Sequence, residues 1–123
     1  MESLNRFIKR AQRRTFPANA YVLEPGWNHL YVRYGPRAAL GRIYSPVLDL
    51  ANLEVEAASR GKGIFTRLIT RLREEHPELH LFVENTHERF GRYLLKLGFV
   101  DVTDTSYQHV QRSYLLEARE KNS

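Results

Sequence analysis

The order of hydrophobic patterns between residues 47 and 83 restricts the fold of this chain more than any other feature. Residues 47–56 (VLDLANLEVE) are nearly continuously apolar at their centre, which predicts a long central strand. Apolar residues then recur at helical spacing until His76 and Pro77 end the pattern, and residues 79–83 form a short apolar strand. A strand, a helix and a strand in this order predict a crossover in an α/β sheet.

Two shorter strands precede this region and predict a hairpin. Residues 20–24 form the first strand, which Pro25 and Gly26 end with a turn. Residues 29–34 (HLYVRY) alternate in the manner of a half-buried strand until Gly35-Pro36. The pattern of residues 38–44 is ambiguous between strand and loop.

A second helix and further strands follow the crossover. The helix is expected from about Thr86 to Leu97, with Gly98 in the position just after its last turn, where glycine commonly ends a helix. Residues 99–102 and 107–116 predict the final strands, and residues 118–123 form a polar tail. The complete order predicts a mixed α/β sheet.

Composition excludes several classes of protein. The 123 residues are 42% hydrophobic and 27% charged, which predicts a single globular domain over residues 1–123. The chain contains no cysteine, so a disulfide framework, a thiolate nucleophile and a cysteine-ligated zinc site are excluded. Its five histidines lack metal-ligand spacing, so no metal is expected. Without an apolar run of about 18 residues or a signal-peptide pattern, we expect a cytoplasmic protein with no membrane segment.

Most of the positive charge lies in residues 1–14. The net charge of the chain is +5, and this segment holds five Lys or Arg against one Glu. Its apolar residues Leu4, Phe7, Ile8 and Ala11 share one side of a helical wheel, opposite the cations. We interpret the segment as a helix packed on the core with a solvated basic face. A nucleic-acid arm, a membrane-surface helix and a transit peptide are the less favoured alternatives.

A basic, glycine-containing loop joins the central strand to the helix that follows it. Gly61 and Gly63 allow close approach of a ligand to the backbone, and the helix start adds partial positive charge, which suits a phosphate. The spacing matches neither a P-loop nor a dinucleotide-binding fingerprint. Taken alone, the loop is equally compatible with a purely structural connection.

Several motifs in order resemble the GNAT superfamily of N-acetyltransferases. They are Leu53-x-Val55, Arg60-Gly61-Lys62-Gly63-Ile64, Leu68, Asn85 and Leu97-Gly98-Phe99. In that family the pattern [R/Q]-x-x-G-x-[G/A] wraps the pyrophosphate of acetyl-CoA, and Arg60, Gly63 and Phe65 occupy its defined positions. Phe65 departs from the small residue expected there, and we expect its side chain to turn into the core beside Ile69.

The resemblance implies an α+β fold with a central, mixed, twisted sheet, a splayed central strand and flanking helices. It implies an acetyl-CoA-binding core over residues 47–102 and an abbreviated N-terminal region, without the family's usual first strand. The backbone of Leu53 and Val55 would pair with the pantetheine arm of acetyl-CoA. Residues 60–65 would hold the pyrophosphate, and Asn85 would meet the cofactor near its middle.

Acetyl transfer requires a group that takes a proton from the acceptor amine. Glu54 is our preferred candidate, because it lies closest to the expected acetyl site, and Asp49, Glu56 or a water molecule are alternatives. Strand alternation places Glu54 opposite Leu53 and Val55 unless a bulge intervenes. His29 and His109 are further, less favoured candidates.

The family's general acid is a tyrosine four residues before the glycine of the Gly-Phe pair, and here that position is Leu94. Tyr93 lies one residue earlier, a rotation of about 100° on a helix. We interpret Tyr93 as an amphipathic residue at the margin of the core and keep catalysis as the alternative.

The sequence therefore predicts an N-acetyltransferase that moves an acetyl group from acetyl-CoA to a primary amine of a protein or a small molecule. The alternatives are a catalytically silent CoA-binding module and a basic adaptor for nucleic acid or protein. The sequence does not specify which amine is the acceptor, or whether the protein is a monomer or a dimer.

Overall fold

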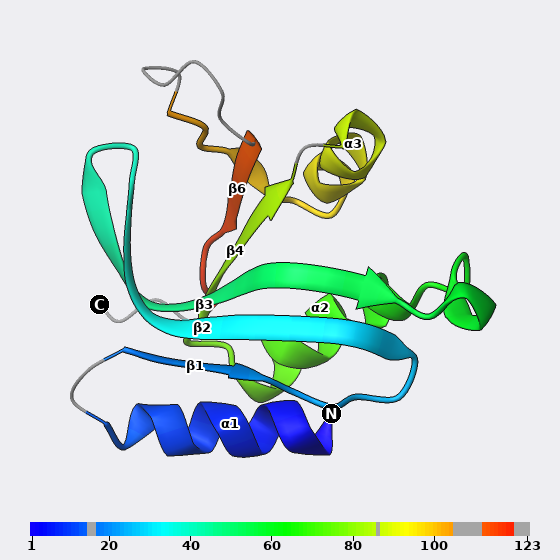
Figure 1. The fold of residues 1–123 in the computed structure, drawn as a ribbon. Helices are drawn as coiled ribbons and strands as arrows, with labels where there is room; N and C mark the ends of the chain where they lie inside the picture. The colour runs from blue at the N-terminus through cyan, green and yellow to red at the C-terminus, as the bar shows by residue number, and fades with distance from the viewer. Residues whose placement is uncertain (15–16, 86, 105–111, 120–123) are drawn as a thin grey trace.

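The computed structural model describes residues 1–14, 17–85, 87–104 and 112–119, and these residues contain a six-stranded mixed sheet (Figure 1). The strands follow the spatial order β1-β2-β3-β4-β6-β5. β3 and β4 are parallel, and the other neighbouring pairs are antiparallel. The strands are β1 (Ala18–Tyr21), β2 (Trp27–Ala39), β3 (Arg42–Val55), β4 (His80–Asn85), β5 (Val100–Asp101) and β6 (Arg112–Leu116).

The helices of the described residues cover one face of this sheet. They are α1 (Glu2–Gln12), α2 (Ile64–Glu75) and α3 (Glu88–Lys96), and each contributes buried side chains to the larger hydrophobic cluster. That cluster takes Leu48 and Leu50 from β3 and Leu81 and Val83 from β4. In Figure 1, α2 lies behind β2 and β3, and α3 lies beside β4. The mixed α+β prediction is confirmed.

The opposite face, which we call the open face, carries a smaller cluster. It consists of Tyr44, Val47, Phe82, Val102 and Leu115, and no residue of the described helices belongs to it. Because successive side chains of a strand point to opposite faces, the odd-numbered Val47 and the even-numbered Leu48 separate onto the two faces. The rest of the open face, outside this apolar cluster, is available to polar side chains.

The basic segment forms the predicted amphipathic helix, α1, which buries Leu4, Phe7, Ile8 and Ala11. Its first turn is stabilised from outside the helix, by Glu24. The Glu24 carboxylate accepts a hydrogen bond from the Leu4 N–H at 2.9 Å and lies 3.1 Å from the Met1 amino group. A negative charge at this end of a helix is favourable, since the first N–H groups have no partner within the helix.

The predicted hairpin is present as the antiparallel pair of β1 and β2, and β2 forms a second, longer hairpin with β3 that the sequence did not predict. The strand expected to stop at Gly35-Pro36 continues to Ala39, and the ambiguous residues 38–44 form the tip. Pro36 is tolerated because the pairing passes from Gly35–Val47 to Arg37–Tyr44 and leaves Pro36, which has no N–H, outside the ladder. The tip turns at Leu40 and Gly41, both with positive φ.

Other boundaries differ by a few residues. β1 ends at Tyr21 rather than at residue 24, and the Glu24 carboxylate instead accepts a hydrogen bond from the first turn of α1. α3 begins at Glu88, and Gly98 follows its end with φ of 102°, the conformation that makes glycine common there. Of the predicted strand 107–116, residues 107–111 lie outside the described residues, and the remainder is β6. None of the helices in the described part of the chain is long and apolar enough to cross a membrane.

His76 at the end of α2 is buried against α1. Its Nε2 lies 2.9 Å from Oδ1 of Asn5. Burial lowers the pKa of His76, and Lys9 lowers it further, while the carboxylates of Glu78 and Glu75 act in the opposite direction. The folded protein therefore holds a proton on His76 less readily than the unfolded chain does.

This shift predicts a loss of stability on mild acidification. As the pH falls through the usual range of histidine, around 6.5, the unfolded chain takes up the proton first, and the free energy of unfolding decreases. The Tm should fall between about pH 7 and pH 5.5, and the His76→Gln variant should lose part of that fall. Thermal unfolding across this range measures both proteins. Equal pH dependence in the two would contradict the assignment.

Candidate functional site

β3 and β4 separate part-way along their length. Parallel pairing joins Val47–Leu50 to His80–Val83 and does not continue beyond these residues. β4 remains paired with β6 up to Asn85, so none of the described strands pairs with the edge of β3 from Ala51 to Val55 on that side. Figure 1 shows the two strands diverging from this point. The prediction of a splayed central strand is confirmed.

A β-bulge at Ala51 accompanies the separation. Tyr31 pairs with Asn52 and Val32 pairs with Leu50, which leaves Ala51 as an extra residue in β3. The extra residue shifts the alternation by one, so Leu53 packs against the helix-covered core as Leu50 does. The bulge thus brings the side chains of Leu53 and Val55 to the helix side and leaves Glu54 on the open face.

The separated strands enclose a cleft of about 860 Å³. The unpaired part of β3 forms one wall, and the beginning of α3 forms another. The size is that of a small-molecule site. Its lining includes Trp27, Leu50, Ala51, Asn52, Leu53, Val55, Phe65, Glu84, His87, Arg89 and Phe90.

The glycine loop lies between the end of β3 and the start of α2. Gly61 and Gly63 have φ of 75° and 71°, a region that other residues rarely adopt. Gly63 is the N-cap of α2, no side chain caps the helix, and the first helical bond of this end is from the Arg67 N–H to the Gly63 carbonyl. The N–H groups of the first turn are therefore available to an anion.

Two arginines hold this loop in shape. Arg60 Nε donates to the Val55 carbonyl at 3.2 Å, and Arg67 Nη1 donates to the Lys62 carbonyl at 2.6 Å. The side chains of Arg60, Lys62 and Arg67 are all exposed. Their charges add to the partial positive charge of the helix start.

Phe65 packs in the core, as expected. It is buried in the same cluster as Ile69, and its ring contacts Phe90 edge-to-face with centroids 5.1 Å apart. The side chain fills the space between α2 and α3 and lines the cleft. Its bulk is therefore accommodated on the helix side of the loop.

Similarity to known proteins comes from solved structures alone, since no family model and no curated protein matches the sequence. The AtaT toxin, solved as a mutant with the C-terminus of the antitoxin AtaR and acetyl-CoA, matches with a TM-score of 0.55 at 18% identity, covering 97% of this chain and 81% of that one. AtaT complexed with acetyl-methionyl-tRNAfMet matches with a TM-score of 0.53 at 19% identity, covering 95% and 82%. An acetyltransferase assigned to the GNAT family, from Desulfovibrio desulfuricans, matches with a TM-score of 0.51 at 17% identity, covering 95% and 77%.

The chain has the fold of the GNAT acetyltransferases. The comparison bears on the whole described domain, because the match spans nearly its full length. At these identities the likeness establishes the fold, and the individual site residues have to be judged from their own geometry.

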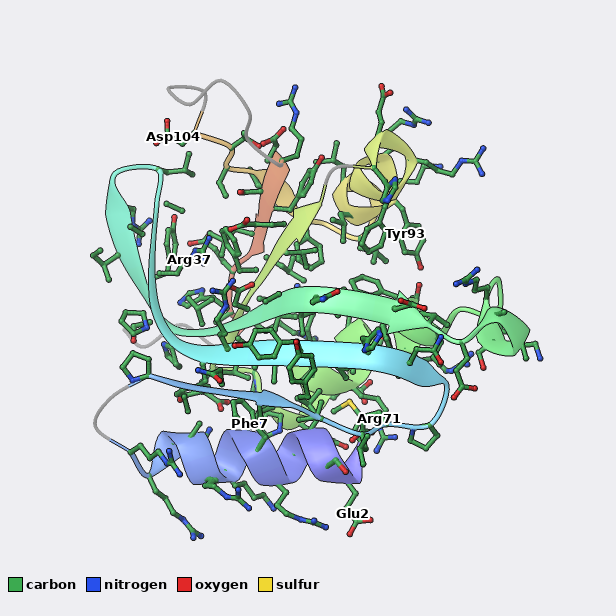
Figure 2. All side chains as sticks on the ribbon, viewed as in Figure 1. Glu2, Phe7, Arg37, Arg71, Tyr93 and Asp104 are labelled. Atoms are coloured by element: carbon green, nitrogen blue, oxygen red, sulfur yellow. The ribbon has the colours of Figure 1, made fainter. Side chains whose placement is uncertain are left out.

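Leu94 takes the position at which the GNAT resemblance places a general acid, and Tyr93 lies one residue earlier. Leu94 is fully buried in the core. Tyr93 is half-buried, and its ring lies 6.3 Å from those of Phe65 and Phe90. Figure 2 shows it leaving α3 toward β3. The expected position of Tyr93 at the margin of the core is confirmed.

The predicted base candidates do not come together in the cleft. Glu54 is on the open face with 46% of its side chain exposed, and its nearest polar neighbours are Asn28 Nδ2 at 3.1 Å and His29 Nε2 at 3.9 Å. Neither Glu54 nor Glu56 lines the cleft. His109 lies outside the described residues.

Asp49 is the third candidate, and it is 4% exposed. One carboxylate oxygen, Oδ2, lies 3.0 Å from Arg37 and 3.3 Å from Arg33, while Oδ1 is buried with no hydrogen-bond partner. Burial raises the pKa of Asp49, Arg37 and Arg33 lower it, and the Glu84 carboxylate raises it. Asp49 is thus held away from solvent by two cations.

Glu84 is a site residue that the sequence did not reveal. It lines the cleft beside the point of separation and forms an ion pair with Arg37. One signal was present: a carboxylate at the end of an apolar strand, in a sheet with parallel neighbours, lies where such folds usually bind ligands. Asn85 follows it as the last residue of β4, where its backbone pairs with Arg112.

The loop geometry leads to a test of anion binding. Replacing Gly63 by Ala places a Cβ beside the helix start and strains a residue with φ of 71°, so acetyl-CoA should bind at least about tenfold more weakly. Isothermal titration and the ligand-induced rise in Tm measure this loss.

Gly41 supplies the matched control. It has φ of 72° and open space around it, but it lies at the hairpin tip. Gly41→Ala should bear a similar backbone strain and keep wild-type affinity for acetyl-CoA. Equal affinity in the two variants would remove the glycine loop from the binding site.

Proposed function

We propose that this protein is an acetyl-CoA-dependent N-acetyltransferase that acts on a primary amine of a protein or a small molecule. The observation that carries the proposal is the unpaired edge of β3, which lines a cleft beside the uncapped start of α2. The GNAT fold supports it, and the structural neighbour AtaT was solved with acetyl-CoA.

The cleft and the neighbouring glycine loop fit acetyl-CoA in their chemistry. The pantetheine arm carries amides, and the edge of β3 at Leu53 and Val55 can pair with them as a neighbouring strand would. The pyrophosphate is anionic, and Gly61–Gly63 with the first turn of α2 offer it N–H groups and positive charge. Asn85 would contact the arm between these two regions. Apolar walls from Phe65 and Phe90 exclude water beside the arm.

The reaction forms a bond between the amine nitrogen and the acetyl carbonyl carbon and breaks the carbon–sulfur bond. The amine gives up one proton, and CoA leaves as a thiolate. N–H groups of the chain that bind the carbonyl oxygen would stabilise the charge that develops there. The chain's remaining tasks are to orient the amine and to receive its proton.

Glu54 remains our proposal for the base, acting through water. Its carboxylate is exposed on the open face beside Asn28 and His29, where water can reach it. Asp49 is less accessible, because it is buried and bound by two arginines. The proton would reach Glu54 through water, since its side chain does not line the cleft.

The Glu54→Gln variant tests this role. Loss of a general base typically costs about 10²- to 10⁴-fold, so kcat/KM should fall by that amount and its acidic limb should disappear. Steady-state kinetics over a range of pH give both quantities. Asp49→Asn, measured in parallel, should keep the acidic limb. Unchanged activity in Glu54→Gln would transfer the role to Asp49, to Glu56 or to water alone.

Tyr93 is proposed to contribute little to the departure of CoA. A thiol has a pKa of about 8.5, so the thiolate can leave without being protonated. Because the ring of Tyr93 packs against Phe65 and Phe90, Tyr93→Phe should lower kcat by less than about tenfold, below a typical acid contribution. A larger loss at unchanged acetyl-CoA affinity would make Tyr93 the general acid after all.

A silent CoA-binding module is the second candidate, and the buried Leu94 in the acid position favours it. It predicts firm acetyl-CoA binding and no turnover with any amine. Turnover should therefore be measured with amines of several kinds. They include an aminoacyl-tRNA, because AtaT was solved with acetyl-methionyl-tRNAfMet.

A further inference from the structure

A second cleft of about 590 Å³ lies on the open face. One wall is the tip of the β2–β3 hairpin at residues 38–41, and the other is formed by residues 102–104 with Ser113. Phe82 of β4 lies between the walls, and Arg37 and Glu84 also line the cleft. Figure 1 shows the hairpin tip rising beyond the sheet on the side of β6.

Glu84 belongs to the lining of both clefts. It lies just after Val83, the last residue of β4 that pairs with β3, where the two strands begin to separate. Its side chain is on the same face as that of Phe82, because the two are separated by two positions in a strand. A molecule in the second cleft and one in the cleft between β3 and β4 can therefore meet at Glu84.

The position of Glu84 is fixed by Arg37. The guanidinium forms ion pairs with both Glu84 and Asp49 and lies over the ring of Phe82, 4.1 Å from its centroid. Asp49 is in turn bound by Arg33 at 3.3 Å. The guanidinium bridges the two carboxylates, with one nitrogen on Asp49 and the other on Glu84, and these contacts restrict the orientation of Glu84.

The charges lining the second cleft favour a cation. Among the lining residues that the structure describes, Arg37 is the single basic side chain, and its charge is shared between Asp49 and Glu84. Glu84 and Asp104 supply two negative charges. The remainder of the lining is apolar, small or hydroxylic, which suits an uncharged chain more than a polyphosphate or a polyamine.

We propose that the second cleft is the acceptor groove, and that it binds a primary amine carrying one positive charge on an otherwise uncharged chain, with the ammonium at Glu84. This inference rests on the proposed function, for which it names the acceptor class. The free α-amine of a short peptide is the probe that combines this charge with a size suited to the groove.

Direct binding tests the groove without any need for turnover. The probe is a lysine-free tetrapeptide amide with a free N-terminus, titrated by calorimetry or NMR into the full chain, with and without CoA. The N-acetylated peptide is the comparison that lacks the positive charge of the α-amine. Spermidine is the comparison that carries several positive charges. The free peptide should bind at least tenfold more tightly than the acetylated one and more tightly than spermidine. Equal binding of the two peptides, or tighter binding of spermidine, would overturn the proposal.

Two variants, Ala39→Trp and Glu84→Gln, and one control variant, Ile43→Trp, locate the site. Ala39 packs against the smaller cluster and lines the groove, so Ala39→Trp should block it, whereas Ile43→Trp on the same hairpin places an equal bulk on an exposed position outside the lining. Glu84→Gln removes the charge with little change of shape. Peptide affinity should fall at least tenfold in Ala39→Trp and in Glu84→Gln and should stay unchanged in Ile43→Trp.

Failure of the groove and failure of the acetyltransferase proposal are distinguishable. Thermal unfolding and acetyl-CoA affinity show whether each variant is folded and whether the first cleft is intact. Should Ala39→Trp be unfolded, Glu84→Gln alone decides the result. Peptide binding that survives both substitutions in folded protein overturns the groove, even if acetyl-CoA is turned over. Groove-dependent peptide binding supports it, even if no acetyl group is transferred.

Discussion

The site depends on the point at which β3 loses its parallel neighbour. Backbone N–H and C=O groups at the edge of a strand require partners, and a strand edge inside a fold is therefore a binding surface. β4 continues with β6 to Asn85, whereas β3 is bent by the bulge at Ala51, so neither strand can close the gap. A ligand that carries amides can satisfy the edge from Ala51 to Val55. The cleft, the glycine loop that follows β3 and the aromatic side chains of α3 are all arranged around that edge.

Local signals made the crossover and the loop predictable. Helix periodicity, the breaks at His76 and Gly98 and the paired glycines all express short-range preferences of the backbone, and these preferences agree with the final fold. The glycines also had to have positive φ for the loop to expose N–H groups, as Gly61 and Gly63 do. The burial of Phe65 followed from its spacing to other apolar residues.

Features that depend on contacts between distant residues could not be predicted from the sequence. The bulge at Ala51 depends on the register between β2 and β3, and nothing in residues 47–56 alone specifies it. The same register brings Arg37 beside Asp49, twelve residues away, and the parallel pairing with β4 adds Glu84. A buried carboxylate is stable only when partners offset its desolvation, so Asp49 in an apolar strand implied a cation whose identity the sequence could not give.

The two departures from the GNAT pattern form one packing arrangement. A small residue in the place of Phe65 would leave space between α2 and α3, and a side chain from α3 could then reach into the cleft. Here Phe65 fills that space, and Phe90 and Tyr93 pack against its ring. Tyr93 is thereby used as a partner of the core, and Leu94 is fully buried behind it. These contacts hold Tyr93 at the margin of the core, one residue before the general-acid position of the GNAT pattern. Under the proposed function, CoA therefore leaves as a thiolate, which the acidity of its thiol allows.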